Sequence, residues 1–217
     1  LTSKLGVNFF REEWDTPGEP PAYGLAGWTE NDSSVLIYDR YDLWDIKPDG
    51  SGARLLTGKF GRENNLILRY QRLDREEKSI SLKKPLLLSA FNDQTKATGF
   101  FRLDPARNEP PTRLIYQDKA LASLQKAKKA EVYIFTAQTF EEFPDLWLSG
   151  PDFNNPRKIS QANPQQTNYL WGKSELITYL NADRRELQAI LIKPENFDPG
   201  KKYPLMVYIY EKLSDGL

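Results

Sequence analysis

The stretch Leu43-Trp44-Asp45-Ile46, a Pro48-Asp49-Gly50 turn and Arg54-Leu55-Leu56-Thr57 form a unit that occurs three times in this 217-residue chain. The later copies begin at Phe100-Phe-Arg-Leu103 and Asp145-Leu-Trp-Leu148, and they continue at Arg113-Leu-Ile-Tyr116 and Arg157-Lys-Ile-Ser160. The aromatic anchors Trp44, Phe101 and Trp147 lie 57 and then 46 residues apart. Short aliphatic and aromatic runs separated by turn residues are typical of β-strands, so the unit predicts repeated β-sheets.

An apolar run precedes each anchor and adds a further expected strand to every unit. These runs are Val35–Tyr38, Pro85–Phe91 and Val132–Phe135. Sheets of several strands that recur about every 40 to 50 residues are typical of β-propeller blades. One such sheet cannot cover both of its own apolar faces, so neighbouring blades must do so. We therefore predict an all-β fold in which residues 1–162 form a partial β-propeller of about three four-stranded blades.

Two segments fall outside this strand pattern. Lys119–Lys129 carries Leu121 and Leu124 among several Lys residues, which favours a short amphipathic helical or irregular segment. Glu12–Pro21 contains Pro and Gly and is expected to be a surface loop.

The last fifty residues follow a different pattern. Tyr169–Leu180 and Glu186–Lys193 are two extended runs joined by the turn residues Asn181-Ala-Asp-Arg-Arg185. A polar loop, Pro194-Glu-Asn-Phe-Asp-Pro-Gly200, then leads to the apolar run Pro204–Tyr210. We expect two antiparallel strands followed by a third, more apolar strand.

The segment from Lys193 to Tyr210 closely resembles the entry to the catalytic domain of the prolyl oligopeptidase family of serine peptidases, which includes the dipeptidyl-peptidases. Ser160-Gln-Ala-Asn-Pro164 is similar to the family's segment that leaves the propeller. The resemblance implies that residues 163–217 are the first strands of an α/β-hydrolase domain, with Pro204–Tyr210 as the third strand. It also implies a complete protein that hydrolyses peptide bonds in short peptides, with a Ser, Asp and His triad located after this chain.

Tyr210 is the one candidate catalytic residue that the resemblance assigns to this chain. A Tyr at the end of this strand donates its hydroxyl to the oxyanion in the family, and the strand end is where α/β-hydrolases form that site. The alternative role for Tyr210 is packing of its ring, as for Tyr203 and Tyr208. The family usually continues with Gly-Gly-Pro, whereas Glu211-Lys212-Leu213 follows here.

The composition excludes several kinds of chemistry for the chain alone. It has 30 basic and 30 acidic residues, so its charge does not favour nucleic acid as a partner. It has no Cys, which excludes disulfides and Cys-based zinc sites, and no His, which excludes a Ser-His-Asp mechanism. No apolar run approaches the ~20 residues of a membrane span. We expect no cofactor and no metal site, and the sequence leaves the compartment open.

Three further motifs are candidates for binding sites. Dipeptidyl-peptidases bind the substrate amine with a Glu pair, but the pairs Glu12-Glu13, Glu76-Glu77 and Glu141-Glu142 lack a matching local motif and favour solvated loop acids. Gly172-Lys173-Ser174 lacks the spacing of a phosphate-binding loop and favours a strand start. Asp39, Asp42 and Asp45 recur at every third position of a strand-like stretch and could suggest a cation site, but the glycine of a calcium loop is missing.

Two other functions remain as alternatives. One is a non-enzymatic β-propeller that acts as a binding scaffold. The other is a carbohydrate-binding β-protein, which would need exposed indoles among Trp14, Trp28, Trp44, Trp147 and Trp171. In either case Pro204–Tyr210 would offer an unpaired apolar edge, so we expect self-association or a partner that supplies strands.

Overall fold

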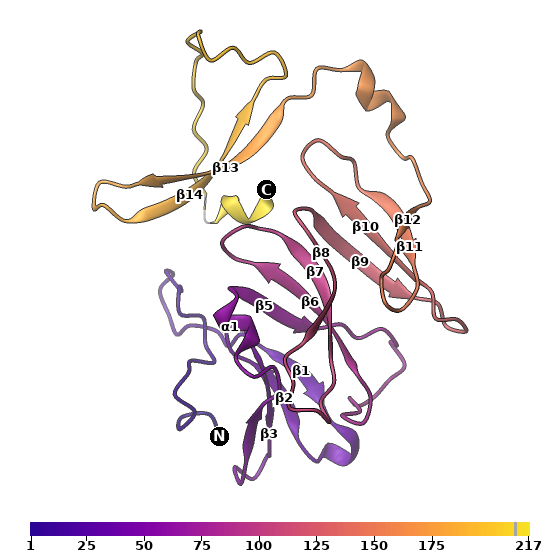
Figure 1. Ribbon diagram of the computed structural model, residues 1–217. Helices are drawn as coiled ribbons and strands as arrows, with labels where there is room; N and C mark the ends of the chain where they lie inside the picture. The colour runs from indigo at the N-terminus through magenta and orange to yellow at the C-terminus, as the bar shows by residue number, and fades with distance from the viewer. Residues whose placement is uncertain (211) are drawn as a thin grey trace.

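The computed structural model describes residues 1–210 and 212–217 and consists mainly of β-sheet (Figure 1). Three four-stranded antiparallel sheets follow one another along the chain, each with its strands in sequence order. The first contains β1 (Leu25–Trp28), β2 (Val35–Tyr38), β3 (Leu43–Ile46) and β4 (Ala53–Leu55). The second contains β5 (Leu66–Tyr70), β6 (Leu86–Asn92), β7 (Thr98–Leu103) and β8 (Thr112–Gln117). The third contains β9 (Ala120–Lys126), β10 (Tyr133–Gln138), β11 (Asp145–Ser149) and β12 (Arg157–Lys158).

The three repeat units correspond to these sheets strand by strand. Each aromatic anchor lies in the third strand of its sheet, and the apolar run before it supplies the second strand. Trp44 pairs with Ile37, Phe101 with Leu88, and Trp147 with Phe135. The prediction of an all-β fold is therefore confirmed, with four strands in each of the three sheets.

The core lies between neighbouring sheets. Leu36 and Leu43 of the first sheet pack with Leu68, Leu88 and other apolar residues of the second sheet. Between the second and third sheets, the Phe100 ring lies 5.3 Å from that of Phe153 and 6.1 Å from that of Phe135, measured between centroids. These side chains are buried because each sheet presents one apolar face to its neighbour.

The N-terminal residues before β1 have little regular structure and cover the other face of the first sheet. Leu5, Val7 and Phe9 pack against its residues Val35, Trp44 and Ile46. The segment Glu12–Pro21 has no helix or strand and is mostly exposed, which confirms the predicted surface loop.

The prediction for Lys119–Lys129 was wrong, because most of this segment is the strand β9. Leu121 pairs with Ala137 of β10 and is buried, whereas Ala122 and Ser123 are exposed. A bulge shifts the register between β9 and β10, and Ser123 adopts a positive φ of 54°. This irregularity disturbs the alternation that would have indicated a strand.

Helices in the described residues are short. They are η1 (Glu30–Asp32), α1 (Phe60–Glu63), η2 (Pro164–Asn168) and η3 (Leu213–Gly216). Across the described residues, the structure has no helix with the length and apolar character needed to cross a membrane.

The C-terminal residues form a hairpin of β13 (Lys173–Leu180) and β14 (Glu186–Lys193), as predicted. The hairpin lies beside the turn ends of the first two sheets, with η3 between them (Figure 1). Gln188 in β14 donates a 2.8 Å hydrogen bond to the Gln94 carbonyl of the β6–β7 turn.

The third strand expected at Pro204–Tyr210 is not formed. This segment has no ladder partner among the described residues, and every residue in it is exposed, Met206 to 93%. A β-strand forms only when its backbone groups pair with those of a neighbouring strand. Neither β13 nor β14 pairs with the segment Pro204–Tyr210. The segment has a strand-type sequence, but the prediction also required a neighbouring strand to pair with it, and the described residues do not supply that strand.

Candidate functional site

Tyr210 lies at the end of the exposed segment Pro204–Tyr210. Its side chain is 62% exposed, and its hydroxyl makes no hydrogen bond to the described residues. The predicted continuation begins with Glu211, which lies outside the described residues. Two residues after Tyr210, Lys212 forms an ion pair with Glu13. The neighbourhood of Tyr210 is therefore the polar surface formed by the turns of the sheets.

The β2–β3 turn forms the base of this surface, and Asp39 holds its shape. The Asp39 carboxylate accepts hydrogen bonds from the backbone N–H of Tyr41 at 2.7 Å and of Asp42 at 2.9 Å. It also accepts one from the Trp44 indole N–H at 2.9 Å. Asp39 is buried, so these donors replace water around its carboxylate.

Asp42 fastens the same turn to the segment that leads into the second sheet. It accepts hydrogen bonds from the Thr57 hydroxyl at 2.7 Å, the Gly61 N–H at 2.9 Å and the Arg62 N–H at 3.1 Å. Burial raises the pKa of Asp42, and these three donors partly oppose the rise. A Cβ at position 61 would lie 2.7 Å from two backbone oxygens, so only glycine fits there.

These contacts show what the three regularly spaced Asp residues of this segment bind. Asp39 and Asp42 are acceptors for protein donors, and Asp45 pairs with Arg54 at 3.4 Å on another part of the strand. Across residues 1–210 and 212–217 there is no group of three His, Cys, Asp or Glu residues that could hold a metal ion. The acids have a structural role that their spacing did not reveal.

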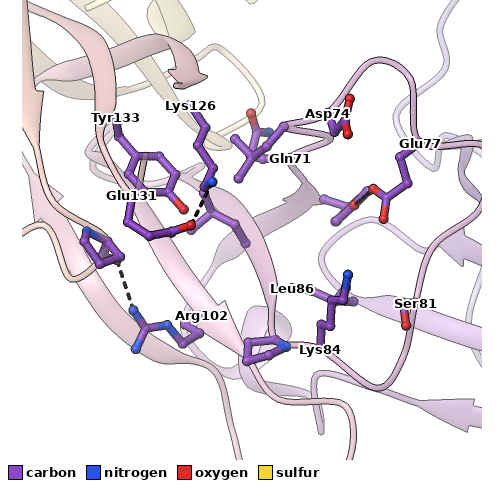
Figure 2. Close-up of a pocket in the computed structure, with 15 residues that line it drawn as sticks. Gln71, Asp74, Glu77, Ser81, Lys84, Leu86, Arg102, Lys126, Glu131 and Tyr133 are labelled. Carbon is purple, nitrogen blue, oxygen red and sulfur yellow. Dashed lines mark hydrogen bonds and ion pairs between the residues drawn. The ribbon is translucent and has the colours of Figure 1, made fainter. Parts of the chain in front are cut away.

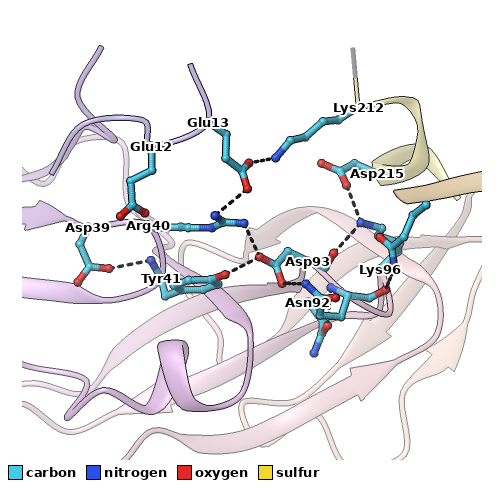
Figure 3. A network of polar contacts seen from close by, with 12 residues as sticks. Glu12, Glu13, Asp39, Arg40, Tyr41, Asn92, Asp93, Lys96, Lys212 and Asp215 are labelled. Carbon is cyan, nitrogen blue, oxygen red and sulfur yellow. Dashed lines mark hydrogen bonds and ion pairs between the residues drawn. The ribbon is translucent and has the colours of Figure 1, made fainter. Parts of the chain in front are cut away.

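Above the turn, Arg40 and Asp93 connect the first two sheets (Figure 3). The Arg40 guanidinium lies 2.9 Å from the Asp93 carboxylate and 2.7 Å from that of Glu13. The Tyr41 hydroxyl donates a 2.7 Å hydrogen bond to Asp93. Burial and then the hydrogen bond to Asp93 raise the pKa of Tyr41 to about 12, so its hydroxyl stays protonated at neutral pH and acts as a donor.

Two lysines extend this network to the C-terminal residues (Figure 3). Lys96 of the β6–β7 turn is buried and binds Asp215 at 2.8 Å and the Asp93 carbonyl at 2.6 Å. Lys212 binds Glu13. We call the set Glu13, Arg40, Tyr41, Asp93, Lys96, Lys212 and Asp215 the polar network. It holds four separate chain segments together, and its described residues place no nucleophile beside a base.

Sequence reasoning did not single out most of the polar network. Arg40 and Asp93 are 53 residues apart, and Lys96 and Asp215 are 119 residues apart. No local motif joins residues at such distances. The one available signal was that both turns follow the second strand of a repeat unit, which places them at the same end of neighbouring sheets.

The three acid pairs have different surroundings. Glu13 belongs to the polar network, and Glu12 accepts a hydrogen bond from Asn8. Glu76 pairs with Lys128 at 3.1 Å, whereas Glu77 is half-buried and accepts a hydrogen bond from the Tyr70 hydroxyl at 3.3 Å. Glu142 binds Lys119. The structure brings no two of these pairs together.

The tryptophans divide into packing and exposed residues. Trp44 is buried, and Trp147 packs against the core between the second and third sheets. Trp14, Trp28 and Trp171 are exposed, but the Trp171 indole N–H donates a 2.6 Å hydrogen bond to the Phe140 carbonyl. Lys173 begins β13, so Gly172-Lys173-Ser174 is a strand start as predicted.

A separate cavity of about 490 Å³ lies between the second and third sheets (Figure 2). It is lined by the ends of β5, β7 and β9, the start of β10 and the loop between β5 and β6. This cavity and the polar network are at opposite ends of the strand β6, since Leu86 lines the cavity and Asn92 adjoins the network turn.

Comparison with known proteins links the chain to peptidases. No protein-family model matches it. It is 30% identical over 124 residues to a probable dipeptidyl-aminopeptidase B of Ajellomyces capsulatus strain H88, covering 48% of this chain and 14% of that protein. The same identity and share of this chain are found with the protein of strain G186AR, of which 13% is covered. The matched part, about half of this chain, thus spans about a seventh of the length of these relatives.

Solved structures share its fold. AtxE2 isopeptidase in its apo form superposes with a TM-score of 0.54 and 14% identity, over 86% of this chain and 27% of the isopeptidase. A variant of the same isopeptidase with Astexin3-dC4 bound gives the same score and identity, over 28% of its chain. At such low sequence identity, the superposition shows a shared fold and does not show a shared function. The sequence comparison shows more, namely distant homology between about half of this chain and part of the probable dipeptidyl-aminopeptidases B.

Proposed function

We propose that this chain belongs to a prolyl oligopeptidase-family serine peptidase that hydrolyses peptide bonds in short peptides. The observation that carries the proposal is the 30% identity to the probable dipeptidyl-aminopeptidases. Residues 1–162 form propeller blades, and residues 163–217 begin the α/β-hydrolase domain. The chain has no His, so the triad His comes from residues outside it, and in this proposal the catalytic Ser and Asp do too.

A change in burial supports the proposed domain boundary. The buried apolar side chains lie between Val35 and Phe153, and among the described residues after Ser160 only Gly172 is buried. The third sheet ends at Lys158, and the short helix η2 follows before the hairpin. A boundary near residue 162 therefore separates a region with its own core from a region without one.

In this proposal the Tyr210 hydroxyl stabilises the transition state. When the catalytic Ser oxygen bonds to the substrate carbonyl carbon, the carbonyl π electrons move onto oxygen, and Tyr210 donates a hydrogen bond to that oxyanion. Pairing of the segment Pro204–Tyr210 with further hydrolase strands would fix the position of the ring. The hydroxyl is available for this role, because no described residue accepts its hydrogen bond.

The test compares two tyrosines of the same segment in the complete protein. Tyr210→Phe removes the oxyanion donor, so we expect kcat to fall roughly 100-fold to 1000-fold with little change in KM. Tyr208→Phe is the matched control and should keep nearly full activity. Equal activity of the two variants, measured with a chromogenic dipeptide substrate, would contradict the role of Tyr210.

The 217-residue chain alone should lack peptidase activity. Incubation with a proline-containing chromogenic dipeptide is expected to release no product above background. Turnover that a serine-reactive phosphonate abolishes would overturn the proposal that the triad lies elsewhere.

The exposed apolar segment also predicts how the isolated chain behaves. Residues Leu205–Ile209 offer unpaired backbone groups and apolar side chains, so copies of the chain should associate through them. Light scattering should show a mass that rises with concentration, and Val207→Lys should reduce the rise. A strictly monomeric chain at high concentration would contradict the expectation.

A further inference from the structure

The cavity between the second and third sheets has the size and lining of a small-molecule site. Its volume of about 490 Å³ falls in the range typical of ligand pockets, roughly 300 to 1,000 Å³. Leu73, Leu86 and Leu87 belong to the lining and provide an apolar part. Figure 2 shows polar side chains, among them Gln71, Lys84 and Glu131, around the same cavity. The cavity therefore combines apolar contact area with polar and charged groups that can orient a ligand.

This cavity is separate from the surface around Tyr210. It lies where β6 begins, and the polar network lies beyond the end of that seven-residue strand. Seven residues of strand span roughly 20 Å, at about 3.3 Å per residue. A ligand in the cavity would thus not contact the segment that ends at Tyr210.

Two hydroxyl groups at the cavity wall belong to largely buried residues and have no partner among the described residues. Ser81 and Tyr133 are each only 8% exposed, and neither hydroxyl makes a hydrogen bond to any of the described residues. Burial, and next the nearby Glu131 carboxylate, raise the pKa of Tyr133, so its hydroxyl is protonated. Both residues line the cavity, so their hydroxyls can donate to or accept from a ligand there.

The lining contains equal numbers of acidic and basic residues, but only some of them form ion pairs within the protein. Lys126 pairs with Glu131 at 2.9 Å, and Arg102 pairs with Asp152 at 2.6 Å. Lys84, in contrast, has no ion pair among the described residues.

Two carboxylates of the lining, Asp74 and Glu77, also form no ion pair among the described residues, and Asp74 is the more exposed of the two. One of its carboxylate oxygens accepts the Glu76 N–H at 2.9 Å, and it forms no ion pair in the described part of the chain. Figure 2 shows Asp74 at the upper edge and Lys84 at the lower edge of the cavity. A single anion or cation would satisfy one of these charges and be repelled by the other, whereas a ligand with both charges satisfies both.

We propose that this cavity binds a zwitterionic peptide of two or three residues. Lys84 binds its carboxylate and Asp74 its ammonium group. The hydroxyls of Ser81 and Tyr133 contact the peptide group, and the leucines contact an apolar side chain. The site is independent of the proposed catalytic role of Tyr210, and it requires no chemistry from the chain.

Titration of the 217-residue chain with alanyl-leucine, followed by calorimetry, tests the proposal. We expect saturable binding, weakened about fivefold to tenfold by Lys84→Ala, since that variant removes a charge-assisted contact. Lys83→Ala is the matched control, because Lys83 is adjacent but absent from the lining. Tyr133→Phe should weaken binding about threefold while thermal unfolding confirms that the variant is folded.

A ligand series distinguishes a specific contact from a general charge effect. Alanyl-leucine amide lacks the carboxylate, so it should bind weakly to the wild-type chain and be insensitive to Lys84→Ala. N-acetyl-alanyl-leucine should show the same insensitivity to Asp74→Asn. Absence of saturable binding, or equal binding of the peptide with both ends blocked, would overturn the proposal. Because no outcome depends on catalysis, failure here would leave the proposed peptidase function untouched.

Discussion

The three sheets and the C-terminal residues contain similar strand-type sequences but differ in burial. In β6 the side chains alternate between buried and partly buried, and Leu88 is fully buried between two sheets. In Pro204–Tyr210 an equally apolar run is exposed along its whole length. The difference shows that β-propensity describes what a segment can pack against rather than a conformation that it adopts alone.

The same comparison explains where the stability of the chain resides. The sheets bury apolar side chains against each other, and their turns hold buried carboxylates with several donors. The hairpin β13–β14 is fully paired by its backbone, yet its faces are exposed or only partly covered. A two-stranded hairpin is marginally stable in water by itself, so this region depends on the few contacts that it makes to the sheets.

The largest difference should come from removing one large apolar side chain in each region. Phe100 is 2% exposed and packs on Phe135 and Phe153, so Phe100→Ala should lower the free energy of unfolding by about 3 to 5 kcal/mol. Ile209 is 86% exposed, so Ile209→Ala should change it by less than about 0.5 kcal/mol. Urea denaturation measures both, and similar losses would show that the C-terminal segment is packed in solution.

Turn acids provide the next contrast. Asp42→Ala leaves the Thr57 hydroxyl and two backbone N–H groups without their acceptor, and should cost about 2 to 3 kcal/mol. Asp183 lies in the exposed β13–β14 turn, where its carboxylate makes no hydrogen bond to the described residues, so Asp183→Ala should be nearly neutral. Thermal unfolding of the two variants checks this, and a neutral Asp42→Ala would mean that water replaces the carboxylate.

The sequence was a good guide wherever local pattern and packing agree. Repeats around Trp44, Phe101 and Trp147 predicted the four-stranded sheets, because alternating apolar residues and turn residues carry that information locally. The prediction failed at Lys119–Lys129, where a bulge at Ser123 breaks the alternation. It also failed at Pro204–Tyr210, where the expected strand needs a neighbour that no local pattern specifies.

The polar network was out of reach for a different reason. The spacing of Asp39 and Asp42 stands out in the sequence, but it does not predict the Trp44 indole or the Gly61 N–H that they bind. Arg40 meets Asp93 only because two turns of separate repeat units lie at the same end of adjacent sheets. Such contacts depend on the relative position of the sheets, which one sequence does not encode locally.

A smaller effect is expected where the third sheet meets the C-terminal residues. Lys158 first, and then the Ser160 hydroxyl and the Ala162 N–H, hold the pKa of Asp145 at about 2, below its ordinary value. The stability that these contacts provide is therefore present above the ordinary pKa of 3.8 and is lost as pH falls towards about 2.

Asp145→Asn tests this pH dependence. The variant should be less stable than the wild-type chain at pH 5, and the gap should narrow as the pH falls below about 4. Lys158→Met removes the main cause of the lowered pKa of Asp145. The difference in stability between this variant and the wild-type chain should likewise be present at pH 5 and narrow as the pH falls. Denaturation curves at several pH values measure the effect, and a gap that stays constant down to pH 2 would contradict it.

The smallest predicted effect concerns the ion pair that joins the two regions. Lys96 is 5% exposed, but it keeps the Asp93 carbonyl as an acceptor when Asp215 is altered, so its charge is not left without a partner. Asp215→Asn should therefore cost only about 0.5 to 1 kcal/mol, in the range of a partly exposed ion pair. The loss should be local, with faster hydrogen exchange in residues 212–217 and unchanged exchange in β6 and β7.

Asp104→Asn, which removes the Arg107 pair within a turn of the second sheet, is the control and should leave hydrogen exchange in residues 212–217 unchanged. If Asp215→Asn instead accelerated exchange in β6 and β7, the sheets would depend on the C-terminal residues, and the contrast between a self-sufficient core and a dependent C-terminal region would be wrong.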